Sequence, residues 1–187
     1  MSFGFDIFIG RWLQKADGYS DNELAQLFDK SFTLYVIFSA LYDKAFNQML
    51  ENGQITQRKV VERDKAVTHF ANFLGHDELA SELKVHAADI SRIEDVILER
   101  KFYFNVKGVY REPDWEEDHK ALLGIRSLDS KVYCESILGL VYRTRCNMFH
   151  GQKTYDAEQE NVLKSMNVLL RTTINMALEK LGISCST

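Results

Sequence analysis

Apolar residues recur with a helical period over most of this chain of 187 residues. From Asp21 to Leu50 they lie three or four positions apart, which predicts one long helix that Gly53 ends. The run Asp21-Asn22-Glu23 predicts a capped start. The central part, Phe32 to Tyr42, is apolar on nearly all sides, which is typical of a helix in the middle of a core.

Further segments have the same period. Two of these predicted helices, Thr56–Leu74 and Ser127–Met148, have a clear buried face. The second helix buries Val60, Val61, Val67, Phe70, Phe73 and Leu74, and the helix from Ser127 buries Val132, Tyr133, Ile137, Leu140, Val141 and Phe149. The predicted helices after the first are Thr56–Leu74, Asp77–Val85, Ala88–Phe102, Ser127–Met148 and Tyr155–Leu181.

One stretch breaks the helical pattern. From Lys101 to Trp115, aromatic and β-branched residues alternate around Lys107-Gly108, which predicts a short hairpin or an extended loop closed by Pro113. No repeat and no linker divides the chain. The prediction is therefore a single all-α domain, 1–187, an up-and-down helical bundle with core helices at about 21–50, 127–150 and 155–181 and an insertion at about 53–118.

Composition narrows the partners that this bundle can have. The net charge is −4 and the pI about 5.8, so contact with nucleic acid requires a local basic patch. The three cysteines form no CxxC pair, which predicts neither a disulfide framework nor a metal site. The first residues lack a basic start, and the most apolar window is too short for a bilayer. We therefore expect a cytoplasmic protein with no membrane association.

Polar and charged residues cluster in "VYRTRCNMFHGQK", residues 141–153. Arg145 carries a fork of donors suited to phosphate oxygens, and Lys153 adds positive charge. His150 exchanges protons near neutral pH, and Asn147 hydrogen-bonds a hydroxyl or a phosphate. Gly151 allows a sharp turn out of the helix. Together these residues could bind a phosphodiester and move protons around it.

Spacing alone leaves the geometry of this stretch open. In a straight helix Arg143, Asn147 and His150 share one face, and Arg145 points elsewhere. If the chain turns near Gly151, Arg145 and His150 converge instead. A purely structural alternative is a helix C-terminus, where histidine complements the helix dipole and glycine adopts the left-handed conformation.

Other residues offer weaker candidates. His69, His76, His86 and His119 fit no metal spacing. The acidic cluster at 114–118 is more typical of a solvated helix start than of an acid-base pair.

The phrase "RCNMFHG" resembles the signature of HEPN domains (higher eukaryotes and prokaryotes nucleotide-binding), an arginine followed four to six residues later by a histidine. Many members read like Arg-x-Asn-Leu-Phe-His-Gly with a nearby lysine, and "LYVIFSALYDKAF" (34–46) resembles their first core helix. Many nuclease members have Asn, Asp or His directly after the arginine, whereas this chain has Cys146 there.

The resemblance implies a HEPN-like bundle and a metal-independent ribonuclease that needs no cofactor. In that reading Arg145, His150 and Asn147 are catalytic, while Arg143, Gly151 and Lys153 contact the substrate. Two motifs would meet across a homodimer, and the setting would be a prokaryotic toxin or defence effector with an antitoxin or another protein partner. The alternative is a non-catalytic HEPN module that binds nucleotide, RNA or a protein.

Overall fold

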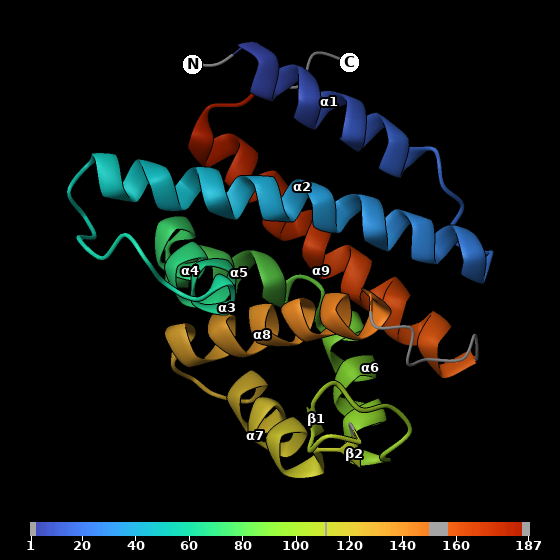
Figure 1. Cartoon of the computed structure of the whole chain (residues 1–187). Coiled ribbons are helices and arrows are strands. Elements are labelled where there is room, and N and C mark those ends of the chain that lie inside the picture. Colours follow the sequence, from blue (N-terminus) through green and yellow to red (C-terminus); the bar gives the residue numbers. More distant parts are fainter. Residues whose placement is uncertain (1–2, 111, 150–156, 185–187) are drawn as a thin grey trace.

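The computed structural model describes residues 3–110, 112–149 and 157–184. The chain folds as an all-α bundle, with one two-stranded hairpin as its β structure in these ranges (Figure 1). Its elements are α1 Phe3–Asp17, α2 Leu24–Glu51, α3 Glu62–Asp64, the π-helical turn η1 Lys65–His69, α4 Phe70–Leu74, α5 His76–Lys84, α6 Ala87–Leu98, β1 Val106–Lys107, β2 Glu112–Pro113, α7 Trp115–Ile125, α8 Ser130–Phe149 and α9 Ala157–Leu181.

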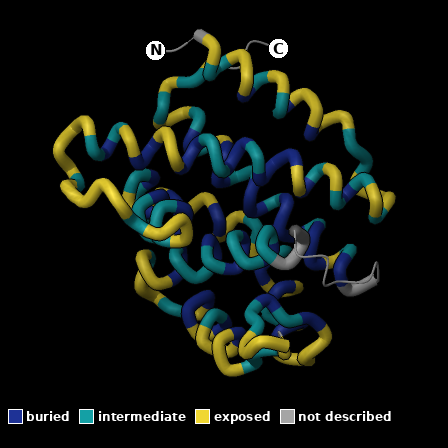
Figure 2. The backbone as a smooth tube through the Cα atoms, viewed as in Figure 1, coloured by how far each residue is buried: buried dark blue, intermediate teal, exposed yellow. Residues whose placement is uncertain are grey.

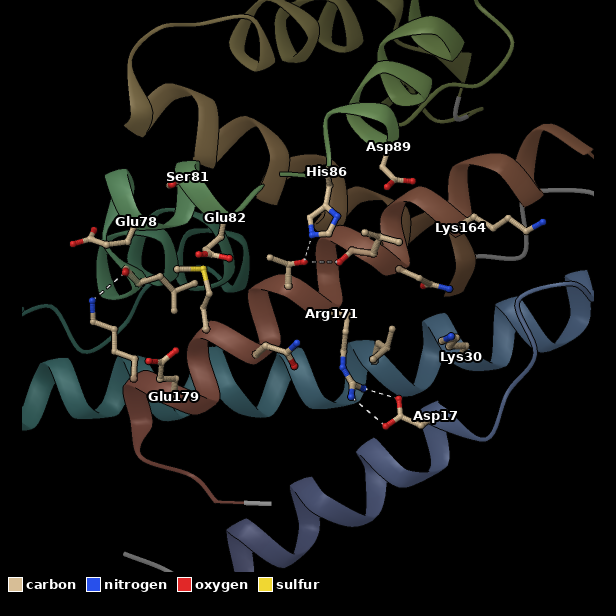
Figure 3. A pocket seen from close by; sticks show the side chains of 18 of the residues that line it. Asp17, Lys30, Glu78, Ser81, Glu82, His86, Asp89, Lys164, Arg171 and Glu179 are labelled. Carbon is tan, nitrogen blue, oxygen red and sulfur yellow. Dashed lines mark hydrogen bonds and ion pairs between the residues drawn. The ribbon is translucent and has the colours of Figure 1, made fainter. Parts of the chain in front are cut away.

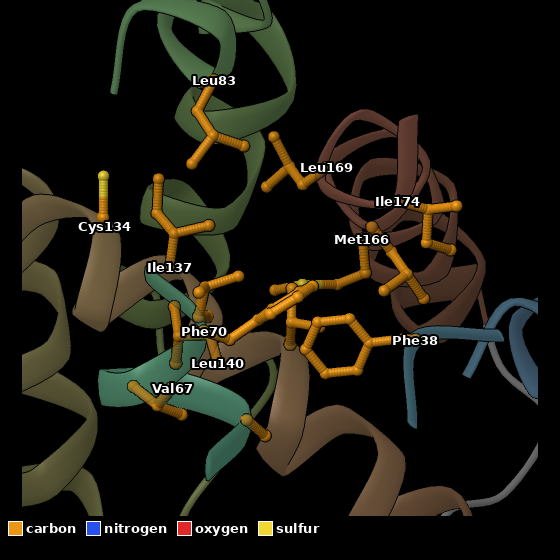
Figure 4. Packing of buried hydrophobic residues seen from close by; sticks show 14 of the residues in the cluster. Phe38, Val67, Phe70, Leu83, Cys134, Ile137, Leu140, Met166, Leu169 and Ile174 are labelled. Atoms are coloured by element: carbon orange, nitrogen blue, oxygen red, sulfur yellow. The ribbon is translucent and has the colours of Figure 1, made fainter. Parts of the chain in front are cut away.

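The long helix α2 is the centre of the bundle, as its apolar middle predicts. It lies between α1 on one side and α8, α9 and the short helices on the other (Figure 1). Phe38 is 1% exposed and meets Phe70 edge to face at 5.4 Å between ring centroids. Figure 4 shows these rings beside Met166 of α9 and Leu140 of α8. One continuous core therefore joins α2, α4, α8 and α9.

The segment at 53–118 contributes to this same core. Val67, Phe70 and Leu83 are at most 2% exposed and pack beside Ile137 of α8 (Figure 4). Residues 53–61 lie mostly outside it and appear in Figure 2 as a largely exposed connection, and residues 107–110 of the hairpin are exposed as well. The short helices are thus structural parts of the bundle.

Four details of the helices differ from the sequence patterns. The hydrophobic period predicted neither helix α1 nor helix α7. Helix α2 begins at Leu24, and its N-cap Glu23 makes no side-chain capping hydrogen bond. The second predicted helix starts at Glu62 instead of Thr56, because Val61 is extended and 64% exposed, so no burial supports a helix there. Val132, which we expected to be buried, is 45% exposed.

The predicted hairpin is confirmed, and two residues of the acidic cluster at 114–118 have structural roles beside it. Val106 pairs with Pro113, and the helix α7 follows with Asp114 as its N-cap. Asp118, however, is not solvated: it is fully buried. Its carboxylate accepts the backbone N–H groups of Phe104 (3.0 Å) and Asn105 (2.9 Å), so it fixes the chain that leads into the hairpin.

Candidate functional site

The described part of the motif, residues 141–149, lies on the last turns of α8, which α2 holds in place. Tyr35 is 3% exposed, and its hydroxyl donates a hydrogen bond to the carbonyl oxygen of Val141 at 2.6 Å. Burial raises the pKa of Tyr35 strongly, so the hydroxyl keeps its proton. The hydroxyl of Thr144, buried in the same turn, donates to the carbonyl of Leu140 at 2.9 Å. These turns are therefore anchored on one side.

Arg145 is held on the other side of these turns by a carboxylate from α3. Its Nη2 lies 3.4 Å from Oε1 of Glu62, and its guanidinium lies 5.9 Å from the centre of the Tyr142 ring. Glu62 also accepts hydrogen bonds from Tyr42 of α2 (2.7 Å) and from Tyr142 (3.4 Å). Four side chains from α2, α3 and α8 thus form one cluster around Glu62, which we call the Glu62 cluster.

The cluster keeps its donors protonated. Burial raises the pKa of Tyr42, and the hydrogen bond to Glu62 raises it further. Burial also raises the pKa of Tyr142, with the neighbouring Cys146 adding to the effect. Burial lowers the pKa of Arg145, but Glu62 and Cys146 outweigh it and the net pKa is raised. Arg145 is therefore a permanent cation with a side chain 29% exposed.

Arg143 faces a different part of the surface. It lines a pocket of about 290 Å³ between α3, η1, α7 and α8, together with Arg63 and Lys120. Two positions along a helix are about 200° apart, which explains why Arg143 and Arg145 diverge. The structure therefore does not bring the two arginines of the motif together.

The remaining predicted site residues are not placed. Asn147 belongs to α8, but its side chain lies outside the described residues. His150, Gly151 and Lys153 lie outside them entirely. Both arrangements proposed for Arg145 and His150, as well as the structural reading of His150-Gly151 as a helix end, therefore stay open.

Sequence reasoning missed the partners of Arg145. Glu62 lies far upstream in a polar stretch, and nothing in its neighbourhood distinguishes it from an ordinary surface acid. The one signal was the pair Tyr35 and Tyr42, seven residues apart in an otherwise apolar helix. Two turns of helix put both hydroxyls on the same face, where Tyr35 bonds to Val141 of α8 and Tyr42 bonds to Glu62 of α3.

Two of the other histidine candidates, His86 and His69, have structural partners. His86 is within 2.9 Å of the Thr172 hydroxyl, and the ring of His69 packs edge to face on Phe46. Among the described residues, no group of three or more histidines, cysteines and acids is arranged to hold a metal. No helix in the described ranges has the length and apolar character needed to cross a membrane.

Comparison of the chain with models of known protein families, with curated proteins and with solved structures found no match. The resemblance to the HEPN signature therefore rests on the sequence of the motif alone.

Proposed function

We propose that this protein is a metal-independent endoribonuclease of HEPN type. The observation that carries the proposal is the charge and the fixed position of Arg145 near the end of α8. Its guanidinium is charged, part of it reaches solvent, and Glu62 and Tyr142 hold it in place. A cation held in this way before the reaction can stabilise charge that develops on a phosphate.

In the proposed reaction the ribose 2′-oxygen loses its proton to a general base and attacks the adjacent phosphorus, while the bond from phosphorus to the 5′-oxygen of the next nucleotide breaks. One fragment then ends in a 2′,3′-cyclic phosphate, and the other carries a 5′-hydroxyl whose proton comes from a general acid. Arg145 offsets the charge on the phosphorane oxygens, and His150 transfers protons as general acid or base. Asn147 orients the histidine or the substrate. Arg143 and Lys153 contact backbone phosphates, and Gly151 provides the turn between them.

One histidine cannot easily serve both proton transfers. We therefore propose a homodimer in which two motifs share one composite site. The proposed setting is the cytoplasm, where the protein acts as a toxin or defence effector under an antitoxin or another protein partner.

A second candidate function has its own support. The guanidinium of Arg145 already has Glu62 as its partner at 3.4 Å, as in a structural ion pair. This favours a non-catalytic HEPN module that binds nucleotide, RNA or a protein partner.

Incubation of the purified protein with mixed RNA in EDTA separates the two functions. The ribonuclease predicts fragments with cyclic phosphate ends, at least about 100-fold fewer with Arg145→Ala or His150→Ala. Arg126→Ala is the matched control for the arginine, because it breaks an ion pair with Glu94 away from the site. His119→Ala, at an exposed position of α7, is the control for the histidine.

A folded wild-type protein that binds RNA or nucleotide without cutting it contradicts the ribonuclease and supports the module. The dimer has a separate test. Mixing the inactive Arg145→Ala and His150→Ala chains forms mixed dimers, and a composite site predicts partial recovery of cleavage. A monomer in light scattering at working concentration contradicts the shared site.

A further inference from the structure

A second surface, unrelated to the motif, has the features of a binding site. A groove of about 1400 Å³ lies among α1, α2, α5, α6 and α9, and no residue of α8 lines it (Figure 3). Its lining includes residues of α9 from Lys164 to Lys180. At 1.5 Å per residue this face is about 24 Å long. The groove is therefore long and larger than most small-molecule pockets, which suits a linear ligand.

The formal charge of the lining is negative. Six carboxylates and four lysines or arginines line the groove, which gives −2 with His86 neutral. Each of these cations already has a partner. The contacts are Lys30 with Asp21 (2.8 Å), Arg171 with Asp17 (2.9 Å), Lys164 with Glu160 (2.6 Å) and Lys180 with the carbonyl of Leu74 (3.0 Å).

Three of the carboxylates have no such partner. The side-chain carboxylates of Glu78, Glu82 and Glu179 make no ion pair or hydrogen bond with any residue that the structure describes, and Figure 3 shows them toward the same end of the groove. Glu78 and Glu82 are four residues apart on α5 and so share a face. The charge that remains available to a ligand is therefore negative, and it favours cationic groups.

A buried amide points independently to a ligand. Asn167 lines the groove and is 5% exposed. Its Oδ1 accepts a hydrogen bond from Ser31 at 2.6 Å, while its Nδ2 has no partner. Turning the amide over only exchanges which of the two atoms is satisfied, because the Ser31 hydroxyl can also accept. Buried polar groups are nearly always paired, so this atom fits a hydrogen bond from a ligand.

We propose that the groove binds a lysine- or arginine-rich peptide segment of a partner protein. The peptide backbone offers acceptors to Asn167, and the cationic heads reach Glu82 and Glu179. The aliphatic stems of those side chains pack on Leu34, Val168 and Met176, which also line the groove. A polyamine has the charge but no carbonyl for the amide, and RNA has the wrong sign of charge.

The test uses the full chain and fluorescence anisotropy of a labelled ten-residue peptide of alternating lysine and alanine. We expect binding that weakens with salt and none with the matching glutamate-alanine peptide. The double variant Glu82→Gln/Glu179→Gln should weaken binding at least tenfold. The control Glu116→Gln/Glu117→Gln removes the same charge from α7 and should leave binding unchanged.

The amide has its own pair of variants. Asn167→Ala removes the amide and Ser31→Ala removes only its partner, so weaker binding in the first variant alone supports recognition by Asn167. Thermal unfolding confirms that each variant is folded. Equal weakening in both acidic double variants means non-specific attraction and overturns the proposal. Spermine binding as tightly as the peptide, or no peptide binding at millimolar concentration, also overturns it. The inference does not depend on RNA cleavage.

Discussion

The two halves of α8 have opposite characters. From Ser130 to Leu140 the helix contributes to the core: Cys134 and Leu138 are fully buried, and the Cys134 thiol donates to the carbonyl of His76 at 3.3 Å. From Val141 onward the helix carries arginines and a half-buried cysteine. In this half Val141 still packs in the core, but its carbonyl oxygen accepts a hydrogen bond from the Tyr35 hydroxyl, and Arg145 pairs with the carboxylate of Glu62.

The first half of α8 therefore contributes mainly to stability, and the second half carries the candidate chemistry. The first half fixes the position and direction of α8 through packing. The second half can then hold a charged side chain at the surface, because α2 and α3 supply Tyr35, Tyr42 and Glu62 as partners. Changes in the first half should therefore alter folding, and changes around the second half should alter function.

The largest expected effect is on folding. Leu138→Ala should lower the free energy of unfolding by about 3 kcal/mol, because it leaves a cavity in a close-packed core. Urea unfolding measures this, with Leu128→Ala as the control at a position 98% exposed. Cleavage per folded molecule should not change. A cost below about 1 kcal/mol contradicts the structural role of the first half.

The next effect is on the proposed reaction. Glu62→Ala removes the carboxylate that holds Arg145 and should reduce RNA cleavage by about 100-fold through misplacement of the guanidinium. The free energy of unfolding should change by less than about 1 kcal/mol, since the pair is partly exposed. Glu117→Ala, which breaks an exposed pair with Lys120, is the control. Faster cleavage by Glu62→Ala would instead show that Glu62 masks the arginine.

A smaller effect concerns the anchor between α2 and α8. Tyr35→Phe removes the hydroxyl that donates to Val141 and should cost about 1 kcal/mol in unfolding free energy. Tyr110→Phe, at a position 91% exposed, should cost nothing measurable. Chemical denaturation of both variants measures the difference. Equal stability of the two variants would mean that this hydrogen bond does not anchor the motif.

The smallest effect is a dependence on alkaline pH. Burial raises the pKa of Cys134 to about 12, whereas a thiol in the unfolded chain ionises near 9. Above pH 9 the unfolded state therefore binds fewer protons than the folded state, and stability falls as the pH rises toward 12. Unfolding at pH 8 and pH 10 measures the fall. The fall should be smaller in Cys134→Ala, and an equal fall in this variant would contradict the assignment to Cys134.

The hydrophobic period predicted much of the fold. It found α2, α5, α6, α8 and α9 because a buried stripe every three or four residues is a local property of the sequence. It also found the hairpin from the alternation around Gly108, which has a φ of +69°. It missed α1 and α7, and it placed the start of the second helix too early, where no packing supports helix formation.

The candidate site could be predicted only in part. Arg145 was preferred over Arg143 only through the resemblance of "RCNMFHG" to the HEPN signature, because spacing alone left both arginines open. Which way Arg145 and Arg143 point depends on the neighbours of α8, and Glu62 and Tyr42 reach Arg145 only when separate helices pack. The sequence thus determined the helices and the candidate chemistry. Only the tertiary structure decided the partners of Arg145, because ion pairs between distant segments form only after the core has aligned them.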